Sequence, residues 1–220
     1  MSTELSFTEE NYLKAIYHLS AGGEKAVQTN EIAEAVSTRA ASATDMIKKL
    51  STKDLLHHEK YYGVTITSRG KHHALHVIRK HRLWETFLVH KLGFTWDEVH
   101  EVAEQLEHIK SDLLISKLDE FLGFPKEDPH GDPIPDGKGR FKVAPQKSLD
   151  QLAVGYQGVI VSVKDTDATL LKFLDKIGAR PGKKIKVLDR EAYDQSVEIM
   201  INNRPVFVSK EVSQNILVAV

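Results

Sequence analysis

The spacing of apolar residues changes abruptly near residue 54, and this change limits the folds open to the N-terminal part of the chain. Before it, residues 8–19, 31–36 and 40–50 carry apolar side chains at intervals of three and four, which predicts three short helices. After it, residues 55–67 have the composition of two strands joined by a turn. Three short helices followed by a β-hairpin are typical of a winged helix-turn-helix domain.

The third predicted helix has the features of a DNA-reading helix. It begins with small residues that let its N-terminus approach a groove, and basic side chains along it can contact phosphates. Many small helical domains share this pattern without binding DNA. We expect Arg39 and Thr44 near bases, and an acid at position 45 could accept from a cytosine amino group. The predicted DNA-binding residues are Arg39, Ala41, Ser42, Thr44, Asp45, Lys48, Lys49, Lys53 and Lys60.

Acidic and imidazole side chains recur with helical spacing in the central part of the chain. If residues 96–108 form one helix, four of them share a face, namely His100, Glu104, Glu107 and His108. Such a face could supply half of a site for a divalent cation. His81 and Glu85 repeat the spacing on another predicted helix. The alternative is an amphipathic helix whose acidic face is simply solvated.

Composition and charge narrow the class of protein further. The chain has no cysteine, which excludes disulfides, a thiolate nucleophile and zinc held by sulfur. It has neither a signal peptide nor a run of the roughly 18 apolar residues that span a membrane, so we expect a cytoplasmic protein without a membrane partner. Residues 1–82 have a net charge of +3 and residues 83–124 a net charge of -6. A basic segment followed by an acidic one suits a polyanion contact beside a cation site.

The last third of the chain has a different pattern. Proline and glycine are frequent over residues 125–145, which indicates a linker. Five short apolar stretches and one short helix follow, which suggests a small SH3-like barrel. The predicted domains are a winged helix-turn-helix (1–73), a helical metal-binding and dimerisation domain (74–124), a linker (125–148) and the barrel (149–220).

Five stretches together resemble a known family, namely residues 10–17, 79–85, 99–100, 104–112 and 131–135. In this order they are similar to the diphtheria toxin repressor family of metal-dependent transcriptional repressors. The resemblance implies a multidomain, mainly α protein with a C-terminal β domain of the SH3-like, FeoA-like kind. It also implies a homodimer that binds double-stranded operator DNA, represses metal-uptake genes and needs no organic cofactor.

The resemblance further implies two metal sites. The primary site would use Asn11, Glu104, Glu107 and His108. The ancillary site would use His81, Glu85 and His100, completed by polar groups of the barrel near Asp165, Thr166 and Asp167. Asn11 departs from the family's usual Asp or Met. Lys14 stands where the related manganese regulator has a second-site glutamate, so a close-spaced pair of metals is not expected.

The metal and the class of function remain open to alternatives. Iron-sensing members carry a cysteine where this chain has Glu104, and an oxygen ligand favours Mn²⁺. The alternative is Fe²⁺, with Zn²⁺, Co²⁺ or Ni²⁺ binding in vitro. A metallohydrolase with Glu107 as its base is a rival, but the sequence lacks HExxH spacing and that reading leaves the helix-turn-helix unexplained. A metal-independent regulator is the third alternative.

Overall fold

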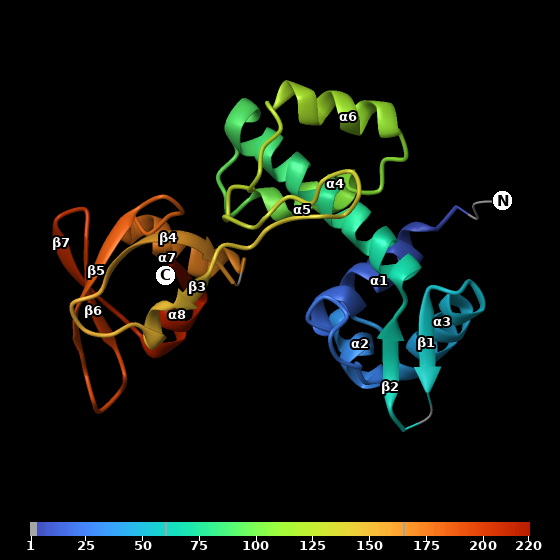
Figure 1. Cartoon of the computed structure of the whole chain (residues 1–220), viewed down its shortest axis with the longest axis horizontal. Helices are drawn as coiled ribbons and strands as arrows, with labels where there is room; N and C mark the ends of the chain where they lie inside the picture. The colour runs from blue at the N-terminus through green and yellow to red at the C-terminus, as the bar shows by residue number, and fades with distance from the viewer. Residues whose placement is uncertain (1–3, 60, 165) are drawn as a thin grey trace. The chain divides into compact units, whose positions relative to one another are not determined.

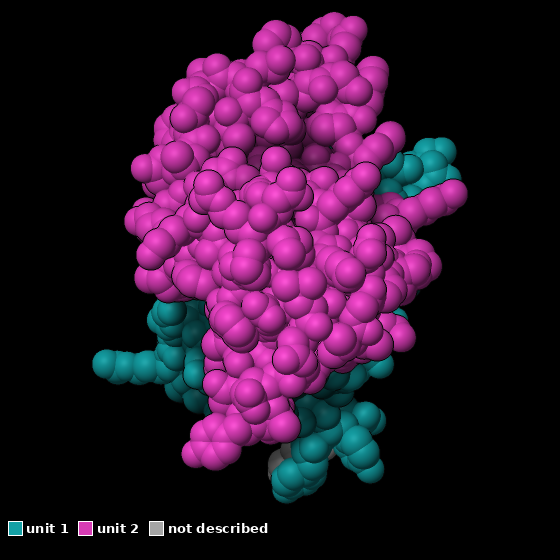
Figure 2. Space-filling model, turned by 90° about the vertical axis from the view of Figure 1, so that its left-hand side faces the viewer, with its two compact units in different colours: residues 1–81, 106–110, 135–140 teal, residues 82–105, 111–134, 141–220 magenta. Residues whose placement is uncertain are grey.

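The computed structural model describes residues 4–59, 61–164 and 166–220, so two predicted site residues, Lys60 and Asp165, lie outside the described residues. The chain divides into two compact units (Figure 2). The first unit comprises the chain up to residue 81 together with residues 106–110 and 135–140. The second unit comprises residues 82–105, 111–134 and 141–220.

The first unit contains the expected winged helix-turn-helix (Figure 1). Its elements are α1 (Phe7–Leu19), α2 (Thr29–Ala35), α3 (Ala40–Thr52), β1 (Leu56–Glu59), β2 (Gly63–Ile66) and the first part of α4 (Ser68–Leu92). α1 begins with a capping box, in which Ser6 and Glu9 bind each other's backbone N–H groups. The helices enclose a core that includes Leu13, Ile16 and Ile47, all fully buried. Burial of the apolar faces of α1, α2 and α3 stabilises three helices that would be only marginally stable in isolation.

Two further helices, α5 (Val99–Leu106) and α6 (Asp112–Phe121), follow α4. In the second unit, Leu83 of α4 packs with Ile115 and Leu118 of α6. The prediction of one helix over residues 96–108 was wrong, because α5 ends at Leu106 and the next two residues form a turn. This turn frees the side chains of residues 107 and 108 from the face of α5, so they can contact α1.

The C-terminal β domain is a six-stranded antiparallel sheet of order β3-β8-β4-β5-β6-β7. Its strands are β3 (Gln146–Ser148), β4 (Gln157–Val163), β5 (Lys184–Arg190), β6 (Val197–Ile201), β7 (Arg204–Val208) and β8 (Ile216–Ala219). A 3₁₀ turn, η1 (Leu149–Gln151), and the helices α7 (Ala168–Ile177) and α8 (Lys210–Asn215) complete the domain. The sequence predicted five strands; β3 was missed because its three residues lack an apolar alternation.

Part of the proline- and glycine-rich segment is packed rather than extended into solvent. Arg82 of α4 donates a hydrogen bond of 2.6 Å to the carbonyl oxygen of Pro133. Gly131 has a positive φ of 85°, and a Cβ added there would lie 1.8 Å from the carbonyl oxygen of Val161 in β4. Only glycine permits this approach of two backbones. Within the described residues, no helix is long and apolar enough to cross a membrane.

Candidate metal centres and DNA-binding surface

A buried carboxylate, Glu107, lies at the centre of a polar cluster in the first unit. Its side chain is 1% exposed. Lys14 of α1 donates to both of its oxygens, at 2.9 and 2.7 Å, and Nδ1 of His81 lies 2.6 Å from Oε2. Burial alone would raise the pKa of Glu107, but His81 and Lys14 outweigh burial and lower the pKa. The cluster therefore keeps an ionised carboxylate out of water, which is one requirement of a metal ligand.

His108 extends this cluster toward the start of α1. Its Nδ1 lies 2.5 Å from Oε2 of Glu10, and its Nε2 lies 3.7 Å from Oε1 of Glu107. The ring of Phe7 stacks on the imidazole at a centroid distance of 4.8 Å. Two carboxylates and an imidazole thus meet where α1 begins. We call Glu10, Glu107 and His108, with Lys14 and His81, the α1 cluster.

The other two predicted primary-site residues, Asn11 and Glu104, have exposed side chains. Asn11 has an exposed side chain on α1, one residue after Glu10. Glu104 lies on α5 in the second unit, where its Oε1 is 3.5 Å from Nε2 of His100. The ligand roles of Asn11 and Glu104 stay predictions. Sequence reasoning missed Glu10, because an acid in the first turn of a helix is equally explained by the helix dipole.

A second cluster lies in the second unit and consists of Glu85, Asp128 and His130. All three side chains are buried, and one ligand atom of each lies within 4.8 Å of the others. His130 Nε2 is 2.7 Å from the carbonyl oxygen of Trp96, which can only accept, so Nε2 carries the proton. Nδ1, the other ring nitrogen, lies 3.8 Å from Oε2 of Glu85 and 4.0 Å from Oδ1 of Asp128. Metal-binding histidines are typically oriented by such a second hydrogen bond.

Electrostatics within this buried cluster favour a cation. Burial first and the charge of Glu85 second raise the pKa of Asp128 to about 7. Burial alone would lower the pKa of His130, but Glu85 and Asp128 raise it to about 8. The negative charge of Glu85 contributes to both shifts. The donor set of two carboxylates and one imidazole fits a divalent cation of the Mn²⁺ or Fe²⁺ kind.

Three of the predicted ancillary residues come together, because His81, Glu85 and His100 each offer a ligand atom within 4.8 Å of the others. Glu85 Oε1 lies 3.5 Å from Nδ1 of His100, and hydrogen bonds that the protonated ring donates to Glu104 and Glu85 raise the pKa of His100 to about 9. His81, one turn before Glu85 on α4, contacts Glu107. Asp167 caps α7, where its carboxylate accepts from the N–H groups of Thr169 and Leu170. Its metal role stays a prediction.

Asp128 and His130 were missed because they lie in the segment interpreted as a linker. A His two residues after an Asp, in a loop rich in proline and glycine, was the available signal. The third member of the cluster, Glu85, is more than 40 positions earlier in the sequence, and only the fold brings the three together.

Replacing Asp128 by Asn should weaken metal binding at this cluster without destabilising the fold. Asn keeps the oxygen that accepts from the N–H groups of His130 and Asp132. A raised carboxyl pKa disfavours the folded state as pH rises from about 4 through about 7, so at pH 8 the metal-free variant should melt at a higher temperature than wild type. Differential scanning fluorimetry should also show a smaller rise in Tm on adding Mn²⁺. The control is Asp132→Asn; equal metal-induced shifts in wild type and Asp128→Asn would contradict a site here.

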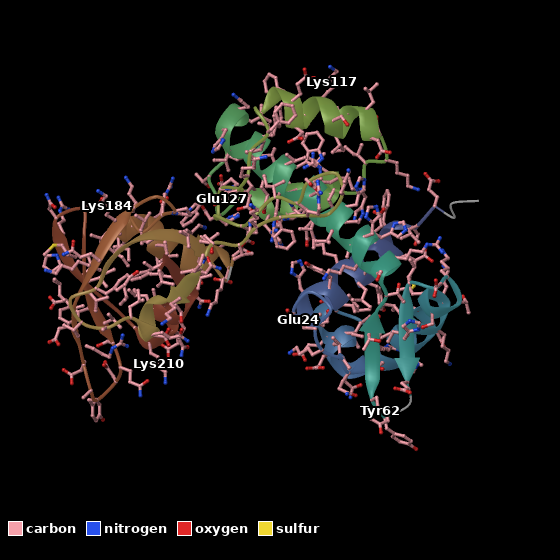
Figure 3. The ribbon with its side chains drawn as sticks, viewed as in Figure 1. Glu24, Tyr62, Lys117, Glu127, Lys184 and Lys210 are labelled. Atoms are coloured by element: carbon pink, nitrogen blue, oxygen red, sulfur yellow. The ribbon has the colours of Figure 1, made fainter. Side chains whose placement is uncertain are left out.

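The predicted DNA-binding residues are mostly exposed along α3. Exposed side chains include Arg39, which is the N-cap residue, and Ala41, Ser42, Asp45, Lys48 and Lys49. Thr44 is half-buried, and its hydroxyl donates to the carbonyl oxygen of Ala40. At the tip of the hairpin between β1 and β2, Tyr62 projects away from the helices (Figure 3) and is 73% exposed. DNA contact by these residues stays a prediction.

Two of the predicted phosphate contacts are engaged with α1. Lys53 Nζ lies 2.6 Å from Oε1 of Glu9, and Lys49 Nζ lies 3.3 Å from the same atom. Glu9 is 2% exposed. Burial alone would raise its pKa, but hydrogen bonds from Lys53, the N–H of Ser6 and Lys49 hold the pKa at about 2. α1 therefore contacts α3 through Glu9 and also supplies Glu10 and Lys14 to the α1 cluster.

Three family models match successive parts of the chain. Residues 4–64 match the iron dependent repressor N-terminal DNA binding domain. Residues 67–136 match the iron dependent repressor metal binding and dimerisation domain, and residues 147–220 match the FeoA domain. The order and extent of these matches confirm the expected fold class.

Individual relatives agree with the family models. The chain is 33% identical to the iron-dependent repressor IdeR of Mycobacterium bovis over 147 residues, which are 67% of this chain and 63% of that repressor. It therefore spans less than two thirds of that relative's length. It is 26% identical to the diphtheria toxin repressor of Corynebacterium jeikeium, with 98% of each covered.

Solved structures resemble the fold over nearly its whole length. A manganese-dependent transcriptional repressor in complex with manganese superposes with a TM-score of 0.88 at 36% identity, covering 96% of this chain and 99% of that one. The manganese regulator SloR gives a TM-score of 0.76 at 33% identity, covering 96% and 97% of the two chains.

Proposed function

Because this chain belongs to the diphtheria toxin repressor family, we propose that it is a metal-dependent, DNA-binding transcriptional repressor that works as a homodimer. The observation that carries this proposal is the double role of α1. Its first turns supply Glu10 and Lys14 to the α1 cluster, and Glu9 to the basic residues of α3. A cation that draws the cluster together also acts on the helix that holds the DNA-reading element.

The metal would act by shifting a population rather than by doing chemistry. In the α1 cluster Glu10, Glu107 and His108 would hold the cation, with Asn11 and Glu104 as further ligands. Bound metal supplies positive charge that stabilises the arrangement in which the start of α1 contacts residues 107 and 108. Its differential affinity for that arrangement is what would bias the protein toward DNA binding. The buried cluster of Glu85, Asp128 and His130 would hold a second cation.

The homodimer is supported by apolar side chains left exposed in the second unit. They lie at the end of α4, on α6 and just after it, at Leu92, Leu113, Leu114, Phe121 and Phe124. The stretch lies within the part that matches the metal binding and dimerisation domain. An unpartnered apolar surface in such a domain is what a two-fold interface would cover.

We propose Mn²⁺ as the metal, with Fe²⁺ as the alternative. The cluster residues offer carboxylate oxygens and imidazole nitrogens, and the chain has no cysteine to offer a softer thiolate. Related structures carry manganese in one case and Zn²⁺ in another, the repressor ScaR. Several ions therefore bind proteins of this family, and the choice in the cell depends on metal availability as well as on ligand type.

The decisive experiment is an anaerobic titration of binding to the gene's own upstream DNA with Mn²⁺ and Fe²⁺ side by side. Mn²⁺ should activate binding at micromolar free metal, and a chelator should reverse it. Replacing Glu104 by Cys should shift the preference toward Fe²⁺, because sulfur is the softer donor. The matched control is Glu101→Cys, an exposed position on the same helix. Metal-independent binding would contradict the regulatory proposal; activation by far lower Fe²⁺ than Mn²⁺ would contradict only the choice of metal.

A further inference from the structure

The α1 cluster already contains a cation that belongs to the protein. The ammonium of Lys14 lies 2.9 Å from Oε1 and 2.7 Å from Oε2 of Glu107. An ammonium that donates to both oxygens lies in front of the carboxylate, where a chelated metal ion would also lie. The pair is shielded from water, since the side chains of Lys14 and Glu107 are 16% and 1% exposed.

A second group, the imidazole of His81, also contacts this carboxylate. His81 Nδ1 lies 2.6 Å from Oε2, on the oxygen that is closer to Lys14. Oε1 is the oxygen nearest His108, whose Nε2 is 3.7 Å away. A metal that approaches Glu107 from the side of His108 therefore meets a positive charge held a few ångströms away in a poorly hydrated site, where repulsion is strong.

We propose that Lys14 is a tethered competitor of the metal and sets the metal concentration at which this repressor responds. The inference rests on the proposed metal centre at Glu107 and deepens it. In the metal-free chain the ammonium neutralises Glu107 and links α1 to residues 106–110. An incoming cation either displaces Lys14 or binds against its charge, and both routes lower the affinity for the metal.

This assignment predicts a gain of affinity, which distinguishes it from a purely structural role. Met has nearly the length of Lys without its charge, so Lys14→Met should bind Mn²⁺ about tenfold more tightly than wild type, because a hydrogen bond to a buried charged group no longer has to be broken. A residue that only positions Glu107 would give weaker or unchanged binding when it is replaced.

Hydrogen exchange gives a readout that does not depend on DNA binding. Without metal, Lys14→Met has lost the link between α1 and Glu107, so amides of α1 should exchange faster than in wild type. With saturating Mn²⁺ the cation supplies the link, and the two proteins should protect α1 equally. The metal-induced change in protection should therefore be larger in the variant.

The test measures Mn²⁺ affinity by chelator competition in the full chain. The matched control is Lys110→Met, which removes the same charge from the same unit but from a residue that pairs with Glu4, 3.3 Å away. Lys14→Gln repeats the test if the methionine variant does not fold. Tighter binding in the Lys14 variant and not in the control supports the inference. Unchanged or weaker binding by the Lys14 variants, beside measurable binding by wild type, overturns it; no Mn²⁺ binding by any of these proteins overturns the proposed function and the inference with it.

Discussion

Replacing Glu107 by Gln should abolish metal-activated operator binding. Glu107 is the buried carboxylate on which Lys14 and His81 converge, and its Oε1 is the oxygen nearest His108. Gln keeps the volume and one acceptor oxygen but carries no charge, so it cannot balance a divalent cation. We expect Mn²⁺ affinity to fall by about 100-fold, because the loss of even a residue that only orients a metal ligand lowers metal affinity by about 10- to 100-fold. Operator binding should then stay at the level of the metal-free protein.

Calorimetry with Mn²⁺ and fluorescence anisotropy with operator DNA would measure the two effects. The control is Glu101→Gln, which makes the same chemical change at an exposed position on α5. Because Lys14 and His81 lose a charged partner, circular dichroism should be used to verify that the variant is folded. A folded Glu107→Gln protein with wild-type activation by Mn²⁺ would remove Glu107 from the metal centre.

Replacing Leu114 by Glu should convert the dimer into monomers and thereby remove high-affinity operator binding. Leu114 is 41% exposed on α6, so a glutamate can reach water in the free monomer. Seven residues further on, Phe121 lies on the same face of the helix and is 62% exposed. A two-fold interface would bury the new carboxylate twice, so we expect the dimer dissociation constant to rise by about 100-fold.

Sedimentation analysis gives the oligomeric state, and operator titrations give the consequence for DNA binding. The control is Ser116→Glu, an exposed position about 200° around α6 from Leu114. Mn²⁺ binding by the α1 cluster should persist in Leu114→Glu, because that cluster lies in the first unit. A dimer of unchanged stability in this variant would show that the interface does not include the exposed face of α6.

The fold of this protein follows largely from local patterns in its sequence. The helical stripes of the first 50 residues, the alternation after them and the later run of short strands indicate the helix-turn-helix, the wing and the β domain. Each of these patterns reports which side of one element faces a core. The Asn202–Asn203 turn between β6 and β7 also has a local cause, since both residues adopt the positive φ that asparagine tolerates.

The metal-binding candidates were only partly readable. Spacing on a single predicted helix identified Glu107 and His108 as candidate ligands, but the helix ends at Leu106 and both residues reach their partners from a turn. Glu10 and Lys14, their partners on α1, are more than 90 residues away in the sequence. No periodicity within one element reports a contact between two elements.

The sequence by itself determined the order of the domains, the faces of the helices and the choice of oxygen and nitrogen donors in a chain without cysteine. The tertiary structure decided which donors meet. It placed the ammonium of Lys14 on Glu107, oriented His130 through the carbonyl of Trp96, and brought Asp128 beside Glu85. The physical reason is that hydrophobic patterning is a local property of the chain, whereas buried charges are compensated by groups that only long-range packing brings within hydrogen-bonding distance.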